Sequence, residues 1–263
     1  MTTIRQDILY SVRLLAKKPV FTALAALSLA LGIGLNTAIF TLINSMLWGP
    51  LPFGDENRIA VIWSVPPQHR DQIDSISIPD YMAFKERNRC FESLGAMTNN
   101  AHDFGAGENG APAQRIIGED FSPELLTALS VKPLMGRLFT PEEDRVDHAA
   151  PVILLSYRLW QSRFGGDPHI IGRTILVDNV GTNIIGILRP DFRFSDDHAD
   201  FVTPLPINHI QLKGSARFLL VGGRLKPGVS IAQAQAEMEP IATRFATEYP
   251  RDMENGKPWT VRI

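Results

Sequence analysis

A glycine pattern near the middle of this 263-residue chain has the spacing of a nucleotide-binding loop. Gly105, Gly107 and Gly110 match G-x-G-x-x-G, in which the glycines let a backbone approach a pyrophosphate closely. That chemistry needs a strand before the pattern and a helix that begins within it. Here a polar NNAHDF segment precedes the glycines, and Ala111-Pro112 follows them. We therefore interpret this segment as a loop that binds no nucleotide.

A second group has the residue types of a metal site. Asp196, Asp197, His198 and Asp200 carry the carboxylate and imidazole groups that bind divalent cations. All four lie in one polar turn without a distant partner at ligand spacing, so we interpret them as a solvated loop. The six histidines form no H-x-x-x-H pair, and the chain has no G-x-S-x-G motif and no P-loop. We expect no catalytic residue, no cofactor and no metal site, and hence no enzyme.

The single cysteine, Cys90, excludes a disulfide within the chain. It lies between Arg89 and Phe91, at the end of an expected helix. We predict that Cys90 is a buried packing residue rather than a reactive thiol.

The elements that would position these residues are predicted by hydrophobic periodicity after about residue 50. Strands are expected at 58–63, 90–97, 113–117, 151–155, 173–177, 182–188, 217–225 and 259–263. Helices are expected at 79–88, 122–129 and 157–164, and a long helix is expected to begin after Ser230. The polar span between residues 97 and 113 is expected to be a loop. The order of the elements predicts an α+β fold.

Local signals fix several boundaries. Ser122 is expected to cap the second helix, and Asp178-Asn179 to turn a hairpin between two strands. Ser230 and Gln233 have the spacing of a capping box. The helix that they open has a predicted buried stripe: Ile231, Ala234, Met238, Ile241 and Phe245.

Pro19 to Gly54 contains no charged side chain, which predicts a membrane anchor. As a helix, residues 20–48 would reach roughly 43 Å, against a hydrocarbon core of about 30 Å. Basic residues precede this stretch, opposed only by Asp7, so the positive-inside rule places the N-terminus in the cytoplasm. We expect a single transmembrane helix over residues 19–49, with everything after about Gly54 on the extracytoplasmic (periplasmic) side of the membrane. A cleaved signal peptide is the alternative, but its apolar core would be about 7 to 15 residues and would end at a small-residue site.

Two helix faces in this region suggest contacts. Small residues recur every four positions and would allow another membrane helix to approach closely; they are Ala26, Ala30, Gly34 and Ala38. The alternative is the ordinary composition of a membrane helix. In residues 1–18, one apolar face predicts a helix that lies along the cytoplasmic membrane surface; its residues are Ile4, Ile8, Val12 and Leu15.

Composition is that of a folded domain. The chain is 44% hydrophobic, and its formal net charge is only −2. The chain has no large basic patch, so nucleic-acid binding is not expected. The residues after the anchor suffice for one large domain or two small lobes.

Several blocks of the sequence carry a family resemblance. They are the anchor block KKPVFTALAALSLALGIGLNTAIFTLINSMLWGPLPF, then SIPDYMAFKERNRCFESLGAM, LTALSVKPLMGRLFTPEED, PVILLSYRLWQSRFGGDPHIIGRTILVDN, GILRPDFRF and LKPGVSIAQAQAEMEPIATRFATEYP. Their order and spacing resemble the N-terminal part of ABC transporter permeases of the MacB type. The closest likeness is to the orphan permeases that are encoded without a fused ATPase domain.

The resemblance implies a two-lobed mixed α/β extracytoplasmic core domain over residues 50–263. One lobe would be inserted within about residues 91–225. It also implies efflux or mechanotransmission in the plasma membrane, with a second permease copy and a separate cytoplasmic ATPase subunit as partners. The transported substrate is not identified by any residue.

This sequence departs from the family pattern at its end. The family carries three further membrane helices of the FtsX type after the core domain, and this chain ends at Ile263. We therefore expect a fragment, a truncated permease or one half of a split permease. A stand-alone membrane-anchored binding or adaptor module of the cell envelope is the alternative. A cell-envelope enzyme would need a pocket with convergent titratable groups, which the sequence does not reveal.

Overall fold

The computed structural model describes residues 17–20, 22–24, 27–34, 37, 56–105, 113–192, 199–207, 215–248, 253–254 and 257–263. The chain divides into two compact units, Met1–Leu51 and Pro52–Ile263. The first unit contains most of the uncharged segment, and the second contains every strand expected from the sequence.

The first unit is helical where it is described, at residues 19, 20, 22–24, 27–34 and 37. Its large apolar side chains, from Val20 to Ile33, are 61–73% exposed. Within the described residues, no helix combines the length and the apolar character that crossing a membrane requires. The structure therefore does not show the transmembrane helix expected over residues 19–49, of which residues 21, 25–26, 35–36 and 38–49 lie outside the described residues.

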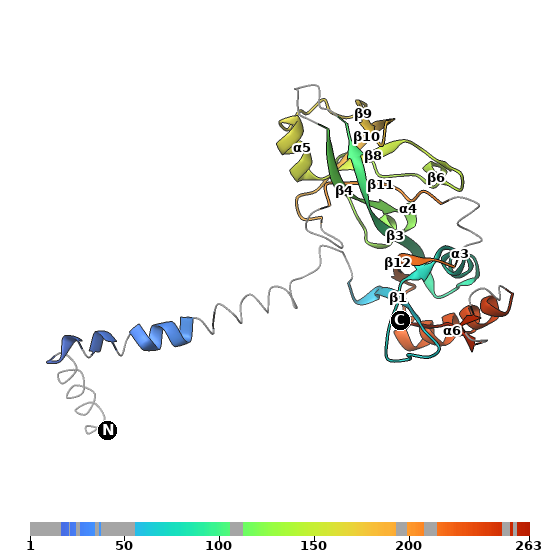
Figure 1. Cartoon of the computed structure of the whole chain (residues 1–263), viewed down its shortest axis with the longest axis horizontal. Helices are drawn as coiled ribbons and strands as arrows, with labels where there is room; N and C mark the ends of the chain where they lie inside the picture. The colour runs from blue at the N-terminus through green and yellow to red at the C-terminus, as the bar shows by residue number, and fades with distance from the viewer. Residues whose placement is uncertain are drawn as a thin grey trace, which may run out of the picture. The chain divides into compact units, whose positions relative to one another are not determined.

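The second unit is built on one mixed sheet, in which eleven described strands are joined by hydrogen bonds (Figure 1). Its main path runs β15 (Thr260–Arg262), β1 (Ile59–Val65), β12 (Arg217–Leu225), β3 (Phe91–Phe104), β4 (Gln114–Phe121), β11 (Phe201–Pro204), β8 (Val152–Leu155), β10 (Val180–Leu188) and β5 (Pro133–Gly136). The short β2 (Ile76–Ser77) pairs with β12, and β9 (Thr174–Val177) pairs with β10 and β3. Two neighbouring pairs, β4 with β11 and β8 with β10, are parallel, whereas the others are antiparallel.

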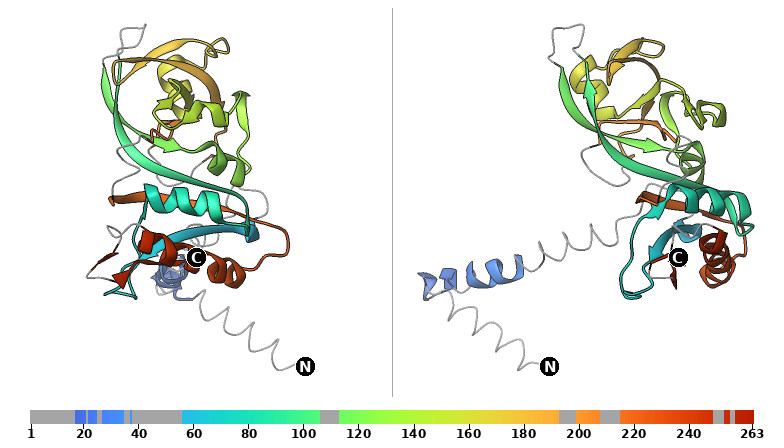
Figure 2. Two further views of the ribbon diagram at one scale, coloured as in Figure 1. Left: turned by 90° about the vertical axis from the view of Figure 1, so that its right-hand side faces the viewer. Right: turned by 45° about the vertical axis from the view of Figure 1, so that its right-hand side comes forward.

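Strand β3 connects the two ends of this sheet. Its first half pairs with β12 from Phe91 to Met97, and its second half pairs with β4 from Met97 to Phe104. Both views of Figure 2 show β3 as one long, curved strand. One continuous strand therefore belongs to both the β12 end and the β4 end of the sheet.

Helices cover the sheet at three hydrophobic clusters. Helices α3 (Ile78–Arg87) and α6 (Ile231–Glu248) pack on each other and bury Phe84 and Met238 beside β1 and β12. Helix α4 (Pro123–Ala128) packs on β3, with Leu125 and Leu126 buried. Helix α5 (Tyr157–Phe164) buries Trp160 against the β8–β10 end. Full burial of one such side chain contributes about 1.5–3 kcal/mol.

Small elements complete the unit. They are the 3-10 helices η1 (Glu56–Arg58) and η2 (Pro141–Glu143), and two paired short strands, β6 (Asp144–Arg145) with β7 (His148–Ala149) and β13 (Met253–Glu254) with β14 (Lys257–Pro258).

Several local predictions are confirmed. Strand β12 has the predicted bounds, and the β9–β10 hairpin turns at Asp178 and Asn179, whose φ angles are +51° and +63°. Positive φ at both residues is the geometry that asparagine and aspartate tolerate in a hairpin turn. The capping box at the start of α6 forms as predicted, with Ser230 N donating to Gln233 Oε1 and Gln233 N donating to Ser230 Oγ.

Two local predictions are wrong, and a third holds only in part. The polar span that we expected to leave the sheet at residue 98 stays in β3 as far as Phe104, because backbone pairing with β4 does not need apolar side chains. Ser122 is the N-cap residue of α4, as predicted, but its hydroxyl makes no cap hydrogen bond, because it accepts a hydrogen bond from Ala96 N at 3.0 Å instead. Ile231 is 51% exposed and lies outside the buried stripe of α6, which begins at Ala234.

Candidate functional site

The predicted contact residues of the first unit are described only in part. Ala30 and Gly34 are helical and exposed, and an added Cβ at Gly34 would meet no atom within 4 Å. The other stripe residues, Ala26 and Ala38, lie outside the described residues. The same holds for the cytoplasmic-face residues, which are Ile4, Ile8, Val12 and Leu15.

The described residues of the glycine motif and of the acidic turn make contacts within the fold. Gly105 N donates to Leu176 O at 2.8 Å, whereas Gly107 and Gly110 lie outside the described residues, as do Asp196, Asp197 and His198. Asp200 pairs with Arg158 at 2.7 Å. In the part of the chain that the structure describes, no three His, Cys, Asp or Glu side chains are grouped so as to hold a metal ion.

Cys90 is buried, as predicted. Burial raises the pKa of its thiol to about 11, and the nearby Glu237 carboxylate adds to the effect. A thiol with a raised pKa holds little thiolate at neutral pH and is a weak nucleophile.

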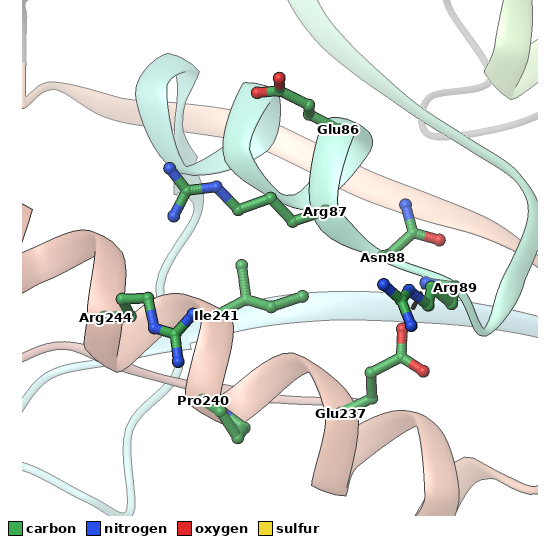
Figure 3. Close-up of a pocket in the computed structure, with 8 residues that line it drawn as sticks. All are labelled: Glu86, Arg87, Asn88, Arg89, Glu237, Pro240, Ile241 and Arg244. Carbon is green, nitrogen blue, oxygen red and sulfur yellow. Dashed lines mark hydrogen bonds between the residues drawn. The ribbon is translucent and has the colours of Figure 1, made fainter.

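A groove of about 580 Å³ lies where α3 ends and α6 passes beside it (Figure 3). Its lining comes from two short segments, Glu86 to Arg89 and Glu237 to Arg244. Figure 3 shows Arg87 on α3 and Arg244 on α6 toward one end, with Ile241 between the helices and Arg89 beside Glu237 toward the other end. Two helix segments far apart in sequence therefore form one basic surface.

The end of α3 that forms one wall is held firmly. Asn88 Nδ2 donates to Phe84 O at 2.7 Å and to Lys85 O at 3.2 Å, which satisfies carbonyls that the helix end leaves open. Glu237 Oε1 accepts hydrogen bonds from the backbone N–H groups of Arg89 and Cys90, the latter at 3.1 Å. The Glu237 carboxylate thus fixes α6 to the turn between α3 and β3.

The charged side chains of the groove differ in whether they have bonding partners. Among the described residues, neither Arg89 nor Arg244 makes an ion pair with a carboxylate, whereas Glu237 is occupied by two backbone donors. The Arg87 guanidinium lies 5.8 Å from the ring centre of Phe245, over its face. Guanidinium groups are planar donors that match carboxylate and phosphate oxygens.

A second polar cluster lies where β3, β4 and the β9–β10 turn meet. His102 Nδ1 lies 2.7 Å from Asp178 Oδ2, and His102 Nε2 lies 3.5 Å from Asp120 Oδ1. The buried Asp120 carboxylate also accepts hydrogen bonds from Asn100 and Thr203. With both ring nitrogens facing carboxylates, the imidazolium form fits the cluster best.

The pKa of His102 follows this geometry. The neighbouring Asp120 carboxylate raises it most, burial opposes the rise, and Asp178 adds to it, so the pKa is about 8 instead of 6.5. Burial tends to raise the pKa of Asp178, but the hydrogen bond from the Asp103 backbone N–H and the contact with His102 lower it more, so the pKa lies below its ordinary value. This cluster ties β3, β4 and the β9–β10 turn together through charge.

Neither the groove nor the histidine cluster was predicted from the sequence. Arg87 and Arg244 are ordinary exposed cations in a helical pattern, and only the α3–α6 contact brings them together. The only sequence signal related to the cluster was Asp178, which was predicted to lie in a hairpin turn.

The fold and these sites define a class, a mixed α/β domain with one continuous sheet and a basic groove between two helices. The family model of the MacB-like periplasmic core domain matches residues 22–241. The chain belongs to this family, which provides periplasmic domains of ABC transporter permeases.

Solved structures show the same fold at low sequence identity. The periplasmic region of MacB from Actinobacillus actinomycetemcomitans is 14% identical, with a TM-score of 0.56 over 82% of this chain and 92% of that one. The extracellular domain of the ABC-type transporter YknZ from Gram-positive bacteria is 13% identical, with a TM-score of 0.54 over 78% of this chain and 100% of that one. A search of curated proteins finds no match.

Proposed function

We propose that this chain provides the extracytoplasmic part of an ABC-type transporter permease and is held at the plasma membrane by its N-terminal segment. The observation that carries the proposal is the family match, which covers residues 22–241 and so begins inside the uncharged segment. Its work is efflux or mechanotransmission, in which movement rather than bond chemistry is passed on.

The described helix of the first unit is compatible with a membrane anchor, and the basic residues before it favour a cytoplasmic N-terminus. The hydroxyl groups on this helix donate hydrogen bonds to backbone carbonyls one turn earlier. Thr22 donates to Lys18 O at 3.0 Å, Ser28 to Leu24 O at 2.9 Å, and Thr37 to Ile33 O at 2.8 Å. Such bonds suit a helix in hydrocarbon, where no water is available to hydroxyl groups. Exposed leucines on the same helix suit lipid better than water.

The second unit is suited to a mechanical role because β3 joins its two ends without interruption. A close-packed domain moves as a body rather than deforming gradually. On this proposal, a cytoplasmic ATPase subunit supplies the movement, a second permease copy completes the transporter, and no nucleic acid is bound.

Site-directed labelling tests the topology. In a Cys90→Ala background, we place a cysteine at exposed His169 or at exposed Lys17. A membrane-impermeant maleimide should label His169→Cys in intact spheroplasts, and should label Lys17→Cys only after permeabilisation. The reverse pattern, or a full-length chain recovered entirely from the soluble fraction, would contradict the proposal.

The small-residue stripe tests partner association. Gly34→Leu keeps the segment apolar, and because no atom lies within 4 Å of an added Cβ, the change meets no obstacle in its own chain. We expect insertion to persist and crosslinking to a partner helix or a second copy to fall, since association in lipid depends on close packing. Leu35→Ile is the control off the stripe. Equal crosslinking of Gly34→Leu and Leu35→Ile would remove this face as an interface.

A further inference from the structure

The turn of the β9–β10 hairpin is attached to β3 through Asp178. Its Oδ1 accepts a hydrogen bond from Asp103 N at 2.8 Å, and its Oδ2 lies 2.7 Å from His102 Nδ1. The backbone contacts beside it are Asp178 N with Asp103 O at 2.9 Å, Gly105 N with Leu176 O at 2.8 Å, and the pairing of Phe104 with Val177. The attachment is short, and its contact between His102 and Asp178 depends on charge.

The two carboxylates that His102 joins differ in their access to water. The Asp120 side chain is 1% exposed and accepts hydrogen bonds from Asn100 and Thr203, whereas the Asp178 side chain is 51% exposed. The His102 ring between them is packed edge-on against the Phe201 ring, with 5.3 Å between the ring centres. Water can replace a lost donor at the exposed carboxylate but not at the buried one, so losing a donor costs more at Asp120.

The proton on His102 decides whether both carboxylates have a donor. The imidazolium has two N–H groups, whereas the neutral ring has one N–H and one bare nitrogen. After the proton is lost, the bare nitrogen must face one of the two carboxylates. The cost is lower at Asp178, so the remaining N–H stays with Asp120 and Asp178 loses its donor.

We propose that His102 is a pH-sensitive latch, which holds the turn of the β9–β10 hairpin on β3 while the ring is protonated and loosens it when the proton is lost. The other charged side chains beside this junction are Arg115 on β4, Asp103 on β3 and Arg163 on α5. Arg115 attracts Asp178 independently of His102, so the turn is loosened rather than freed. Strand β11 contributes the uncharged Thr203 and Phe201.

The raised pKa of His102, about 8, agrees with this arrangement and places the change between neutral and weakly alkaline pH. The latch acts locally, since it concerns the hairpin turn in the folded chain. It is independent of the transport role, because it rests on the cluster alone.

Amide hydrogen exchange of the full chain in a nonionic detergent tests the latch at pH 6.5 and pH 9, with exchange times scaled to the intrinsic rate at each pH. The probes are peptides that cover residues 101–105 and 174–180, read at times at which β1 and β12 have not exchanged. Their protection should fall about tenfold between the two pH values, as a pKa of about 8 in the latched chain and 6.5 in the loosened one implies. His102→Gln should remove this pH dependence.

Matched variants separate the latch from a general effect of histidine. Asp178→Asn keeps a residue that tolerates the positive φ of this position and should give weak protection at both pH values. His69→Gln removes an exposed histidine outside the cluster and should keep the pH dependence of the parent. Thermal unfolding of each variant confirms that it is folded. The proposal is overturned if the parent's hairpin peptides are equally protected at both pH values, if folded His102→Gln keeps the parent's pH dependence, or if these peptides exchange only together with β1 and β12.

Discussion

Arg217 and Asp80 form a buried ion pair, with Arg217 Nη1 at 2.8 Å from Asp80 Oδ2 and less than a tenth of either side chain exposed. Arg217 also donates to Ser64 Oγ at 2.6 Å, and its guanidinium lies 4.1 Å from the ring centre of Trp259, over its face. Asp80 in turn accepts from Ser77 Oγ at 2.9 Å. One pair therefore connects β12, β1, the start of α3 and the segment before β15.

Removing one member of this pair should destabilise the fold strongly. Arg217→Met leaves the Asp80 carboxylate buried without its cation, which typically costs about 3–5 kcal/mol. We expect that loss in the free energy of unfolding measured by urea denaturation. The double variant Arg217→Met with Asp80→Leu should recover part of it, because no buried charge then remains. A single variant as stable as the parent would show that the pair has no structural role.

His102 should make stability depend on pH in the weakly alkaline range. Its folded-state pKa is about 8, above the ordinary 6.5, so the folded state holds the proton more tightly than the unfolded state. The stabilisation is complete below about pH 6.5 and is lost as the pH rises through 8. It amounts to about 2 kcal/mol.

The measurement is the free energy of unfolding at pH 6, 7, 8 and 9, for the parent and for His102→Gln. The difference between the two chains should shrink as the pH rises. A difference that stays constant across this range would show that His102 contributes by packing alone.

The uneven success of the sequence predictions has a physical basis. The start of α6 was predictable because Ser230 and Gln233 satisfy each other's backbone over four residues, without help from the rest of the fold. The second half of β3 was not predictable. Its residues join the sheet through backbone hydrogen bonds to β4, and such bonds form whether the side chains are polar or apolar. Ser122 was correctly predicted as the N-cap residue of α4, but the partner of its hydroxyl, Ala96 N, was not predictable because it is a neighbour only in the folded chain.

The sites were less predictable than the strands. The basic groove depends on the packing of α3 against α6, and single arginines on helices carry no signal of that contact. The family resemblance identified the kind of domain, but no motif in it pointed to the groove.

Asp144 should destabilise the fold at neutral and higher pH. Burial raises its pKa to about 8, the Glu124 carboxylate raises it further, and Lys85 opposes both. Its Oδ1 has no hydrogen-bond partner in the described structure. A carboxyl group with a raised folded-state pKa loses stability as the pH rises from its ordinary value of 3.8 toward 8.

Asp144→Asn removes this charge and should raise the free energy of unfolding at pH 8 by roughly 1–3 kcal/mol. At pH 4 the change should have little effect, because the aspartate is then protonated in the folded state. Glu239→Gln, at an exposed position on α6, is the control. Equal effects of Asp144→Asn at both pH values would contradict the assignment.

Gly95 should tolerate no side chain, because α4 packs directly on the backbone of β3 at this point. An added Cβ would lie 2.6 Å from Leu125 Cα and 2.5 Å from Ser122 Oγ, closer than real contacts allow. Both obstacles belong to the start of α4, so Gly95→Ala must push the helix away from the strand. Overpacking of this kind costs about 1–3 kcal/mol or more. Gly181→Ala is the matched control, since the nearest atom there is a Thr174 methyl group at 3.3 Å. Urea denaturation should show a lower midpoint for Gly95→Ala and an almost unchanged one for Gly181→Ala, whereas equal midpoints would mean that α4 does not rest on β3 as described.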